Sequence, residues 1–382
     1  MTDRIPSVTE QGIKVTFLKA NLRSYNSGTA DGIRFCSRAW LPSENRARLV
    51  WQRRIEDRLE LEEIIDTQGA GSFEDGRIFD FGNRTFIAYT EGIYVRKPFQ
   101  SIQRLAVLGP DFQPAEKITI KYGNNGNGKS EKNWQFFEWN GRLHFVYSIN
   151  PHVVVALDGR KNFAVAEDFV TGGPIHWPWG DVLRGGTPPI AYRHPEFGDC
   201  FLSFFHTHAL HRERNRRYAM GGYLFRDRPP FAIVALSEAI LIASENDPTF
   251  PNPSVPDWHP LVVFPCGVFP NLVPTGRIVH VSLGVNDSMD AIAEIDPLKL
   301  RWHPVDYYGQ PKIRYFRAGN GPLPILLKGA LTHWKLVKMP VVSSGRPGYL
   351  ALSDPGLIDA ALRRTDVKEI DEEQFLKYEK LK

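Results

Sequence analysis

The chain has 382 residues, which is enough for one large domain or two ordinary ones, and 42% of them are hydrophobic, as a packed core requires. The formal net charge of +4 excludes a strongly basic nucleic-acid arm, although a local basic patch could bind a phosphate or an acidic sugar. Three cysteines make no disulfide framework, which fits a reducing compartment. The N-terminus lacks an apolar secretory segment, and no run of about 18 apolar residues occurs, so the sequence predicts a cytoplasmic protein without a membrane span.

Short β-strands are the predicted elements over most of the chain. Residues 1–30 are a lead-in that is expected to close a ring of sheets. From there to about residue 300, runs rich in Val, Ile, Phe, Tyr and Thr alternate with turns that contain Gly, Pro and Asn. Asn140-Gly141 is a strong signal for a tight hairpin. The stretch LELEEIIDTQ from Leu59 is compatible with either a strand or a short helix.

One weak repeat occurs five times in this region, as a turn with glycine, a β-rich run and a polar end. The copies lie roughly fifty to eighty residues apart, near the period of propeller blades. A β-sandwich has no reason to repeat a unit at this spacing, whereas a propeller packs similar four-stranded blades around a channel. The sequence therefore predicts an all-β, five-bladed β-propeller over residues 1–300. The copies are DGIRFCSR from Asp31, GNRTFIAYT from Gly82, GRLHFVYS from Gly141, GDCFLSFFHT from Gly198 and GRIVHVSLG from Gly276.

Residues 301–382 are predicted to complete the ring and to form a short C-terminal helical extension. PGLIDAALRR has the pattern of a helix, with Pro355 near its start. The final EIDEEQFLKYEKLK is expected to be a charged helix or a frayed tail. The extension could pack on a second copy of the chain, so a homo-oligomer is possible.

Polar residues gather at the strand ends of the five copies, which a propeller brings together around one mouth of its channel. Carboxylates and amides bind sugar hydroxyls and aromatic faces stack on sugar rings, so this mixture favours a glycan ligand. The alternative is that these residues only form turns and close the blades. In chain order they are Asn26, Arg38, Glu74, Asp75, Arg77, Glu131, Lys132, Asn133, Trp134, Tyr147, Ser148, Thr187 with its neighbours Gly185, Gly186 and Pro188, His206, His208, Ser282 and Asp287.

The motifs FEDGRI, EKNW, GGTPPI, FFH, VVFP and SLGVND occur in this order between about residues 20 and 295. Together they resemble glycoside hydrolase family 130, the mannoside phosphorylase family. The resemblance implies a five-bladed propeller that acts with inversion on a β-mannoside or a related glycoside. Asp75, in the family's acid motif, would be the proton donor, acting through a hydroxyl of the bound sugar. Arg38, Lys132 and His206 would bind phosphate, and Asp287 would contact the sugar.

The other polar strand ends are expected to bind substrate: Asn26, Glu74, Arg77, Glu131, Asn133, Trp134, Tyr147 and Thr187. One position departs from the family's acid motif, because Gly76 replaces the proline after the aspartate. Glycine relaxes φ at this turn, so the acid would be held differently. The departure leaves open a non-catalytic glycan-binding propeller, and a propeller that binds other proteins is a third interpretation.

The nucleophile is also open at this point. Phosphate needs cations rather than a second catalytic carboxylate, and the basic residues Arg38, Lys132 and His206 favour it. Water would need a carboxylate base, for which Glu131 is the nearest candidate. A sugar nucleotide could be held by the basic loop HRERNRRY from His211, although such a loop is more often a solvated face. We expect no metal and no cofactor, inorganic phosphate or a sugar nucleotide as co-substrate, and an oligosaccharide or glycan rather than nucleic acid as partner.

Two further motifs suggest other chemistry. Residues 123–130, GNNGNGKS, match a phosphate-loop pattern, but the aromatic, turn-bounded sequence that follows does not have the pattern of the helix which that mechanism needs. A loop rich in Asn and Gly beside the channel is the preferred interpretation. His206, His208 and His211 have the spacing of metal ligands, but no accompanying carboxylate motif is visible. One anion-binding histidine with surface histidines is therefore favoured over a metal site.

Overall fold

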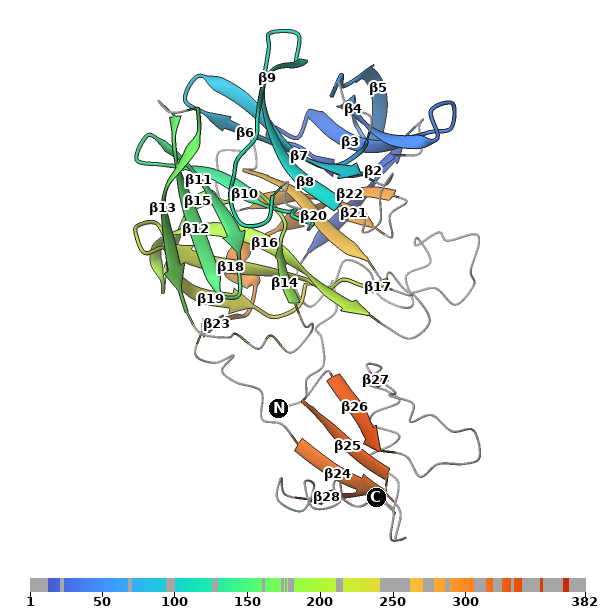
Figure 1. The fold of residues 1–382 in the computed structure, drawn as a ribbon, viewed down its shortest axis with the longest axis vertical. Helices are drawn as coiled ribbons and strands as arrows, with labels where there is room; N and C mark the ends of the chain where they lie inside the picture. Colours follow the sequence, from blue (N-terminus) through green and yellow to red (C-terminus); the bar gives the residue numbers. More distant parts are fainter. Residues whose placement is uncertain are drawn as a thin grey trace.

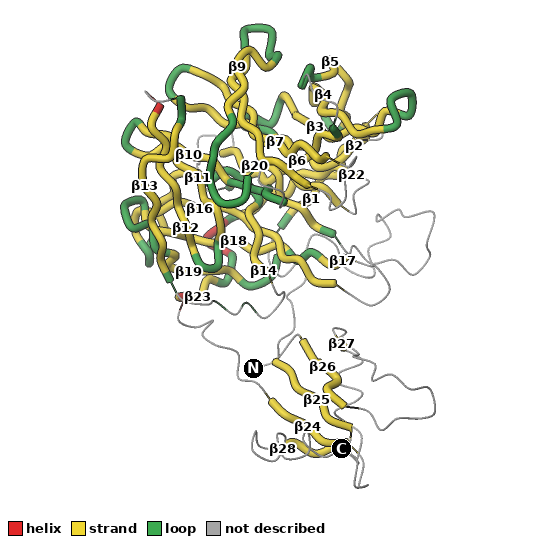
Figure 2. The backbone as a smooth tube through the Cα atoms, in the orientation of Figure 1, coloured by secondary structure: helices red, strands yellow, loops and turns green. Residues whose placement is uncertain are grey.

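The computed structural model shows a chain built almost entirely of β-strands, which fill the body in Figure 2. Helix in the described part amounts to the short 3-10 turn Pro297–Lys299 and the single 3-10 residues Gly159 and Val305. Within that part, no helix has the length and hydrophobicity needed to cross a membrane. The described residues are 13–305 except 21–23, 68–70, 94–99, 126–129, 160–161, 173–174, 176, 178–181, 211–215, 241–261, 271–277 and 286–288, together with 314–318, 325–330, 333–338, 351–352 and 367–370.

Three groups of four antiparallel strands follow one another along the chain, each strand pairing with the next (Figure 1). The first group contains β2 (Ser24–Gly28), β3 (Arg34–Leu41), β4 (Arg46–Ile55) and β5 (Arg58–Ile64). The second contains β6 (Ser72–Phe81), β7 (Arg84–Ile93), β8 (Gln100–Leu108) and β9 (Pro114–Ile118). The third contains β10 (Gln135–Trp139), β11 (Arg142–Ser148), β12 (His152–Asp158) and β13 (Ala164–Thr171).

The fourth group has the path β14 (Val182–Gly185), β16 (Gly198–Leu210), β18 (Met220–Arg226), β19 (Ile233–Ser237) and β23 (Trp302–Pro304). Strands β15 (Ile190–His194) and β17 (Arg216–Arg217) also pair with β16. Strand β23 joins this sheet and lies in the segment 301–382, which the sequence analysis expects to complete the ring.

The fifth group takes its outer strand from the N-terminal lead-in. It consists of β20 (Val263–Pro270), β21 (Val279–Val285), β22 (Met289–Ile295) and β1 (Lys14–Ala20). Strand β1 is antiparallel to β22 and then runs parallel to β5 for two residue pairs, Lys19 with Arg58 and Ala20 with Leu59. These two pairs join the fifth group to the first, so the lead-in connects the two ends of the body.

The hydrophobic core is divided into clusters that lie between successive groups. Phe73 and Trp51 share a cluster between the first two groups, and Phe79 and Phe145 one between the second and third. Similar clusters join the third group to the fourth and the fourth to the fifth. The cluster with Phe35, Leu59, Phe269, Leu18 and Ile292 lies between the fifth group and the first. Each group therefore packs on its two neighbours, as in a propeller-type architecture.

The described residues of the C-terminal part are strands and form a sheet of their own (orange in Figure 1). The sheet contains β24 (Arg314–Ala318), β25 (Ile325–Ala330), β26 (His333–Lys338), β27 (Ala351–Leu352) and β28 (Val367–Ile370). The predicted helix from Pro355 lies outside the described residues. The described residues of this part therefore form strands rather than the predicted helical extension. Runs such as HWKLVK satisfy their backbone groups by antiparallel pairing.

Two local predictions have clear outcomes. Asn140 and Gly141 have φ angles of 48° and 68° and join β10 to β11, so the predicted tight hairpin is confirmed. The ambiguous stretch from Leu59 is a strand, β5, which pairs with β4.

Candidate active site

Local irregularities in the strands β2, β6 and β20 create the candidate site. Pairing of β6 with β7 shifts register between Glu74 and Arg77, so Asp75 and Gly76 form a bulge. Asp75 has a φ of 59°, a left-handed conformation that non-glycine residues seldom adopt. Similar register shifts occur in β2 and β20. Such bulges redirect side chains and are common beside functional sites.

The structure gives a steric reason for Gly76. A Cβ atom at this position would lie within 3.0 Å of the Cys36 sulfur, a separation that real Cβ atoms essentially never show. The Cys36 side chain is fully buried in β3, so the thiol occupies the room that a proline ring would need. The positive φ belongs to Asp75, not to Gly76. The sequence analysis expected Gly76 to relax φ at this turn. The structure instead explains Gly76 by packing, because a side chain at this position would collide with the buried Cys36 thiol.

Four charged side chains meet at the bulge. Nη1 of Arg38, from β3, lies 2.7 Å from Oε2 of Glu74. Nζ of Lys132, which precedes β10, lies 3.7 Å from Oε1 of Glu74 and 3.7 Å from Oδ2 of Asp75. The structure thus brings together the predicted acid, Asp75, and two of the three predicted phosphate ligands, from three different strand groups.

The electrostatics of Lys132 follow from this arrangement. Burial by itself lowers the pKa of a lysine, because it penalises the charged form. The negative charges of Asp75 and Glu74 act in the opposite direction and outweigh burial, so the pKa of Lys132 is raised. Lys132 therefore remains a cation next to both carboxylates.

Arg77 is a structural connection rather than an open binding group. Its side chain is 1% exposed. Its Nε donates to the carbonyl oxygen of Gly186, Nη1 donates to the carbonyl oxygen of Asp75 at 3.1 Å, and Nη2 donates to Oδ1 of Asn133 at 3.1 Å. The guanidinium also lies 5.4 Å from the ring centre of Phe264 in β20. Burial lowers the pKa of Arg77, against the nearby charge of Asp75. Arg77 and Asn133 thus tie together the strands that surround the acid.

Glu131, Tyr147 and Trp134 form a neighbouring group. Oε1 of Glu131 accepts hydrogen bonds from the Tyr147 hydroxyl at 2.9 Å and from the backbone N–H of Asn124 at 3.0 Å. Burial and the bond to Glu131 raise the pKa of Tyr147 to about 12. Trp134 is fully buried and stacks on Phe145 at 4.5 Å, so its ring is part of the core. Oε1 of Glu131 is therefore engaged by Tyr147 and Asn124.

The remaining predicted residues occupy different places. His206 in β16 is buried, and its ring lies 4.5 Å from Phe264 and 5.2 Å from Tyr218. Phe264 also lies against the Arg77 guanidinium, so the Phe264 side chain stands between His206 and the charged cluster. Thr187 is buried, and its hydroxyl accepts from the Phe204 backbone N–H at 3.0 Å. Asp287 lies outside the described residues.

Asn26 belongs to the bulge of β2, and the next residue, Ser27, is held by Asp290, a residue that the sequence analysis did not single out. Oδ1 of Asp290, in β22, accepts from the backbone N–H of Ser27 at 3.1 Å. Asp290 is buried, its Oδ2 has no hydrogen-bond partner among the described residues, and burial raises its pKa to about 7. The signal that could have found it is the placement of Asp290 among apolar residues in MDAIAEI, a run that also contains the acidic Glu294. Asn26 itself is buried against Gly284.

The competing motifs are partly described. Residues 126–129 of GNNGNGKS lie outside the described part. Asn125 beside them bonds Gln103 and Ile120 through its side chain, and the next regular element is the strand β10 rather than a helix. Within the basic loop, Arg216 and Arg217 form β17, and the other arginines lie outside the described residues. Among the described residues, no group of His, Cys, Asp and Glu is arranged to hold a metal ion.

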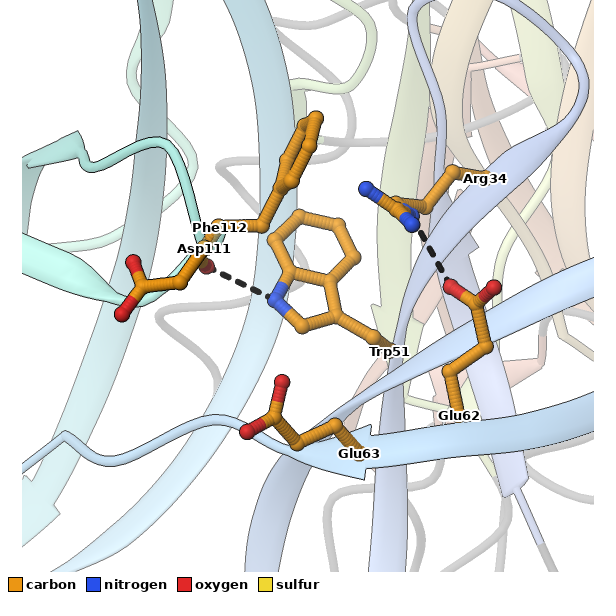
Figure 3. Close-up of a pocket in the computed structure, with 6 residues that line it drawn as sticks. All are labelled: Arg34, Trp51, Glu62, Glu63, Asp111 and Phe112. Atoms are coloured by element: carbon orange, nitrogen blue, oxygen red, sulfur yellow. Dashed lines mark hydrogen bonds and ion pairs between the residues drawn. The ribbon is translucent and has the colours of Figure 1, made fainter.

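A cavity of about 340 Å³ lies elsewhere, between the outer strands of the first group and the β8–β9 turn (Figure 3). Nε1 of Trp51 donates to the carbonyl oxygen of Phe112 at 2.9 Å, and the Arg34 guanidinium lies 4.0 Å from the centre of the Phe112 ring. Arg34 is also paired with Glu62 at 2.9 Å. None of the candidate residues lines this cavity, so we assign it to the joint between the first two groups.

The fold and the site together define an all-β protein of propeller type. Its buried carboxylate–cation cluster lies where β3, β6 and the segment before β10 meet. No family model matches the chain, and no curated protein matches it. The fold is similar to that of a mannose phosphorylase from Leishmania mexicana in complex with phosphate ion, with a TM-score of 0.52, 12% identity, and coverage of 74% of this chain and 88% of that chain. A GDP-Man-dependent mannosyltransferase from the same organism has a TM-score of 0.49, 12% identity, and coverage of 74% and 90%. A GH43_1 enzyme from Xanthomonas citri complexed with xylose has a TM-score of 0.43, 10% identity, and coverage of 75% and 91%.

Proposed function

We propose that this protein is a carbohydrate-active enzyme on a five-bladed β-propeller, and that it transfers a glycosyl group with inversion by phosphorolysis of a β-mannoside or a related glycoside. The five strand groups, each packed on its neighbours, support the number of blades. The observation that carries the reaction is the contact of Lys132 and Arg38 with the Glu74–Asp75 pair.

The proposed chemistry assigns one role to each side of the cluster. Asp75, as general acid, donates a proton to the leaving oxygen, directly or through a hydroxyl of the bound sugar, while the bond between that oxygen and the anomeric carbon breaks. An oxygen of inorganic phosphate forms the new bond on the opposite face, and the product is a glycosyl phosphate. Arg38 and Lys132 hold the phosphate, which brings its own negative charge and needs no carboxylate base. His206 is proposed as a more distant contributor on the same side.

Two further points support phosphate over water. Glu131, the candidate base for hydrolysis, uses Oε1 to accept hydrogen bonds from Tyr147 and Asn124. The mannose phosphorylase from Leishmania mexicana, which has a similar fold, was solved with a phosphate ion. The likeness concerns the fold, so the sugar, the acceptor and the use of a sugar nucleotide are decided by experiment. A cytoplasmic location and a homo-oligomer remain predictions.

The test uses the full chain with mannose 1-phosphate or GDP-mannose and a panel of sugar acceptors, and measures released phosphate or GDP. Phosphate release from mannose 1-phosphate is expected, and Asp75→Asn should reduce it by at least about a hundredfold. Asp80→Asn is the matched control, because Asp80 lies on the same strand, is exposed, and bonds only Thr85 among the interactions described. It should leave turnover unchanged.

Three outcomes would contradict the proposal in different ways. Equal turnover by wild type and Asp75→Asn would remove the acid role. Release of GDP without any release of phosphate would identify a sugar-nucleotide-dependent transferase. Sugar binding that Asp75→Asn leaves unchanged, without turnover on any donor, would identify a glycan-binding protein.

A further inference from the structure

The charged cluster is ordered by depth. The side chains of Asp75 and Glu74 are 4% and 9% exposed, whereas those of Arg38 and Lys132 are 21% and 31% exposed. A ligand that approaches from solvent therefore meets the two cations first and the carboxylates behind them. This order suits an anionic ligand, because the cations lie between it and the negative charges.

Glu74 connects the two cations. Its Oε2 contacts Arg38 at 2.7 Å, and its Oε1 contacts Lys132 at 3.7 Å, so one carboxylate places cations from two strand groups side by side. Lys132 has a second, equally distant contact with Oδ2 of Asp75. Arg38 is thus held closely by Glu74, while Lys132 is shared between two carboxylates at longer distances. Lys132 is the cation with more freedom to turn toward a ligand.

The proposed role of Asp75 conflicts with this arrangement as it stands. A general acid has to carry a proton before it can donate one, whereas here Oδ2 of Asp75 lies 3.7 Å from the Lys132 ammonium group, in the geometry of an ion pair. The conflict disappears if Lys132 leaves Asp75 when the reaction partner arrives. An anion that binds Lys132 would remove the favourable contact and add a negative charge nearby, and both changes favour a protonated Asp75.

The charge count points the same way. With Glu74 and Asp75 ionised and Arg38, Lys132 and the buried Arg77 charged, the cluster carries a net charge of +1, from three cations and two anions. A bound dianion would change this to −1 in a largely buried place, where an uncompensated charge is unfavourable. One proton on Asp75 restores neutrality.

We propose that a dianion binds at Arg38 and Lys132 together with one proton on Asp75, and that Glu74 is a positioning residue which keeps Arg38 and Lys132 at this place. The proton comes from solvent and forms an O–H bond on the Asp75 carboxylate, as Lys132 turns from Asp75 to the anion. Phosphate binding would thus load the acid that the same phosphate needs. The inference rests on the proposed function in taking Asp75 as the acid.

Other titratable groups surround the cluster and need separate controls. Arg77 lies on the same strand as Asp75, Cys266 of β20 and Tyr218 interact with the cluster electrostatically, and Asp290 of β22 interacts with Cys266. Asp290 is one group that could itself take up a proton near neutral pH, since burial raises its pKa to about 7. An experiment on proton uptake therefore has to separate Asp75 from Asp290.

The experiment is calorimetric titration of the full chain with sodium sulfate, which stays a dianion across the range from about pH 5 to about pH 8. Each titration is run in two buffers that differ in ionisation enthalpy, so that the difference in heat gives the protons taken up per sulfate. We expect wild type to take up about one proton at some pH in this range. Asp75→Asn should bind sulfate without this uptake, and Asp290→Asn should retain it.

Variants of the cations and of Glu74 test the geometry. Lys132→Met should weaken sulfate binding at least tenfold. Glu74→Gln removes a negative charge, which by simple repulsion would strengthen sulfate binding, whereas loss of positioning weakens it, and we expect weakening. Glu91→Gln is the matched control, because Glu91 pairs with Arg104 at 2.7 Å and, among the described ion pairs, with no member of the cluster. It should leave sulfate binding unchanged, and far-ultraviolet circular dichroism checks that each variant is folded.

Several results would overturn the inference. They are the absence of sulfate binding, sulfate binding without proton uptake at any pH in the range, uptake that persists in Asp75→Asn, or tighter binding by Glu74→Gln. Turnover is measured separately on the same proteins. Proton-coupled sulfate binding without turnover on any donor would contradict the proposed glycosyl transfer and leave the coupling standing, so the two failures are distinguishable.

Discussion

The contact between Gly76 and Cys36 predicts a pair of substitutions whose effects do not add. Gly76→Ala places a Cβ within 3.0 Å of the Cys36 sulfur, while the next neighbours, Cys36 Cβ and Leu49 Cδ2, stand at 3.4 and 3.5 Å. Because the thiol is fully buried, it cannot turn into solvent. The overpacking should lower the free energy of unfolding by about 1–3 kcal/mol.

The sulfur is the atom that causes the conflict, so its removal should reverse the sign. In a Cys36→Ala background, the new Cβ at position 76 fills part of the vacated space. Replacing glycine by alanine where the backbone allows it also stabilises by about 0.4–1 kcal/mol, because the unfolded chain becomes less flexible. Gly76→Ala should therefore be neutral or stabilising in this background, which corresponds to a coupling free energy of about 1–4 kcal/mol.

The assay is urea unfolding of wild type, both single variants and the double variant, followed by tryptophan fluorescence. The midpoint should shift while the denaturant slope stays constant. Gly82→Ala is the control, because Gly82 has a φ of +58° and nothing within 4 Å of an added Cβ, so it should destabilise equally with and without Cys36. Equal destabilisation by Gly76→Ala in both backgrounds would refute the steric explanation of the altered acid motif.

Three further results are expected. Arg77→Ala should lower the free energy of unfolding by more than about 3 kcal/mol in the same urea assay, because it leaves buried acceptors without their donor. The control Arg84→Ala breaks an exposed pair with Glu116 and should change the free energy of unfolding by less than about 1 kcal/mol. Burial raises the pKa of Asp290 from 3.8 to about 7, so the unfolded chain loses this proton at a lower pH than the folded chain does. The free energy of unfolding should therefore fall by up to about 4 kcal/mol as the pH rises between these two values, with no further loss above about pH 7. Unfolding of Asp290→Asn measured from about pH 4 to about pH 8 should lack that decline, and an unchanged decline would contradict the assignment to Asp290. Lys132→Met should raise the KM for mannose 1-phosphate at least tenfold in the turnover assay, and an unchanged KM would exclude Lys132 from the anion site.

Sequence reasoning succeeded where a property is local. The turn at Asn140-Gly141 needs positive φ at two successive residues, and this requirement is visible in two letters of sequence. The repeat of glycine turn and β-rich run predicted an all-β body for the same reason, because alternation and turn residues report on neighbouring positions. The family resemblance also placed Arg38 and Lys132 near the acid, and both lie in one charged cluster with Glu74 and Asp75.

It was less informative where burial decides the role. Arg77, Trp134 and Thr187 have side chains that suit a sugar site, yet in the structure they connect or fill the interior. Their residue types are the same in both settings, and only the surrounding packing separates them. Asp290 escaped notice for the opposite reason, since its place in an apolar strand gave little sign that it holds the bulge of β2.

The all-β body with its repeated strand pattern, the tight turns, and the charged residues of the acid motif could thus be inferred from the amino-acid sequence alone. These follow from backbone preferences and from the period of the hydrophobic residues, which act over a few positions. The tertiary structure was needed to find that Glu74 holds Arg38 and Lys132 and that Cys36 requires Gly76. Those facts depend on contacts between residues far apart in the chain, where burial and distance, rather than residue type, set the energy.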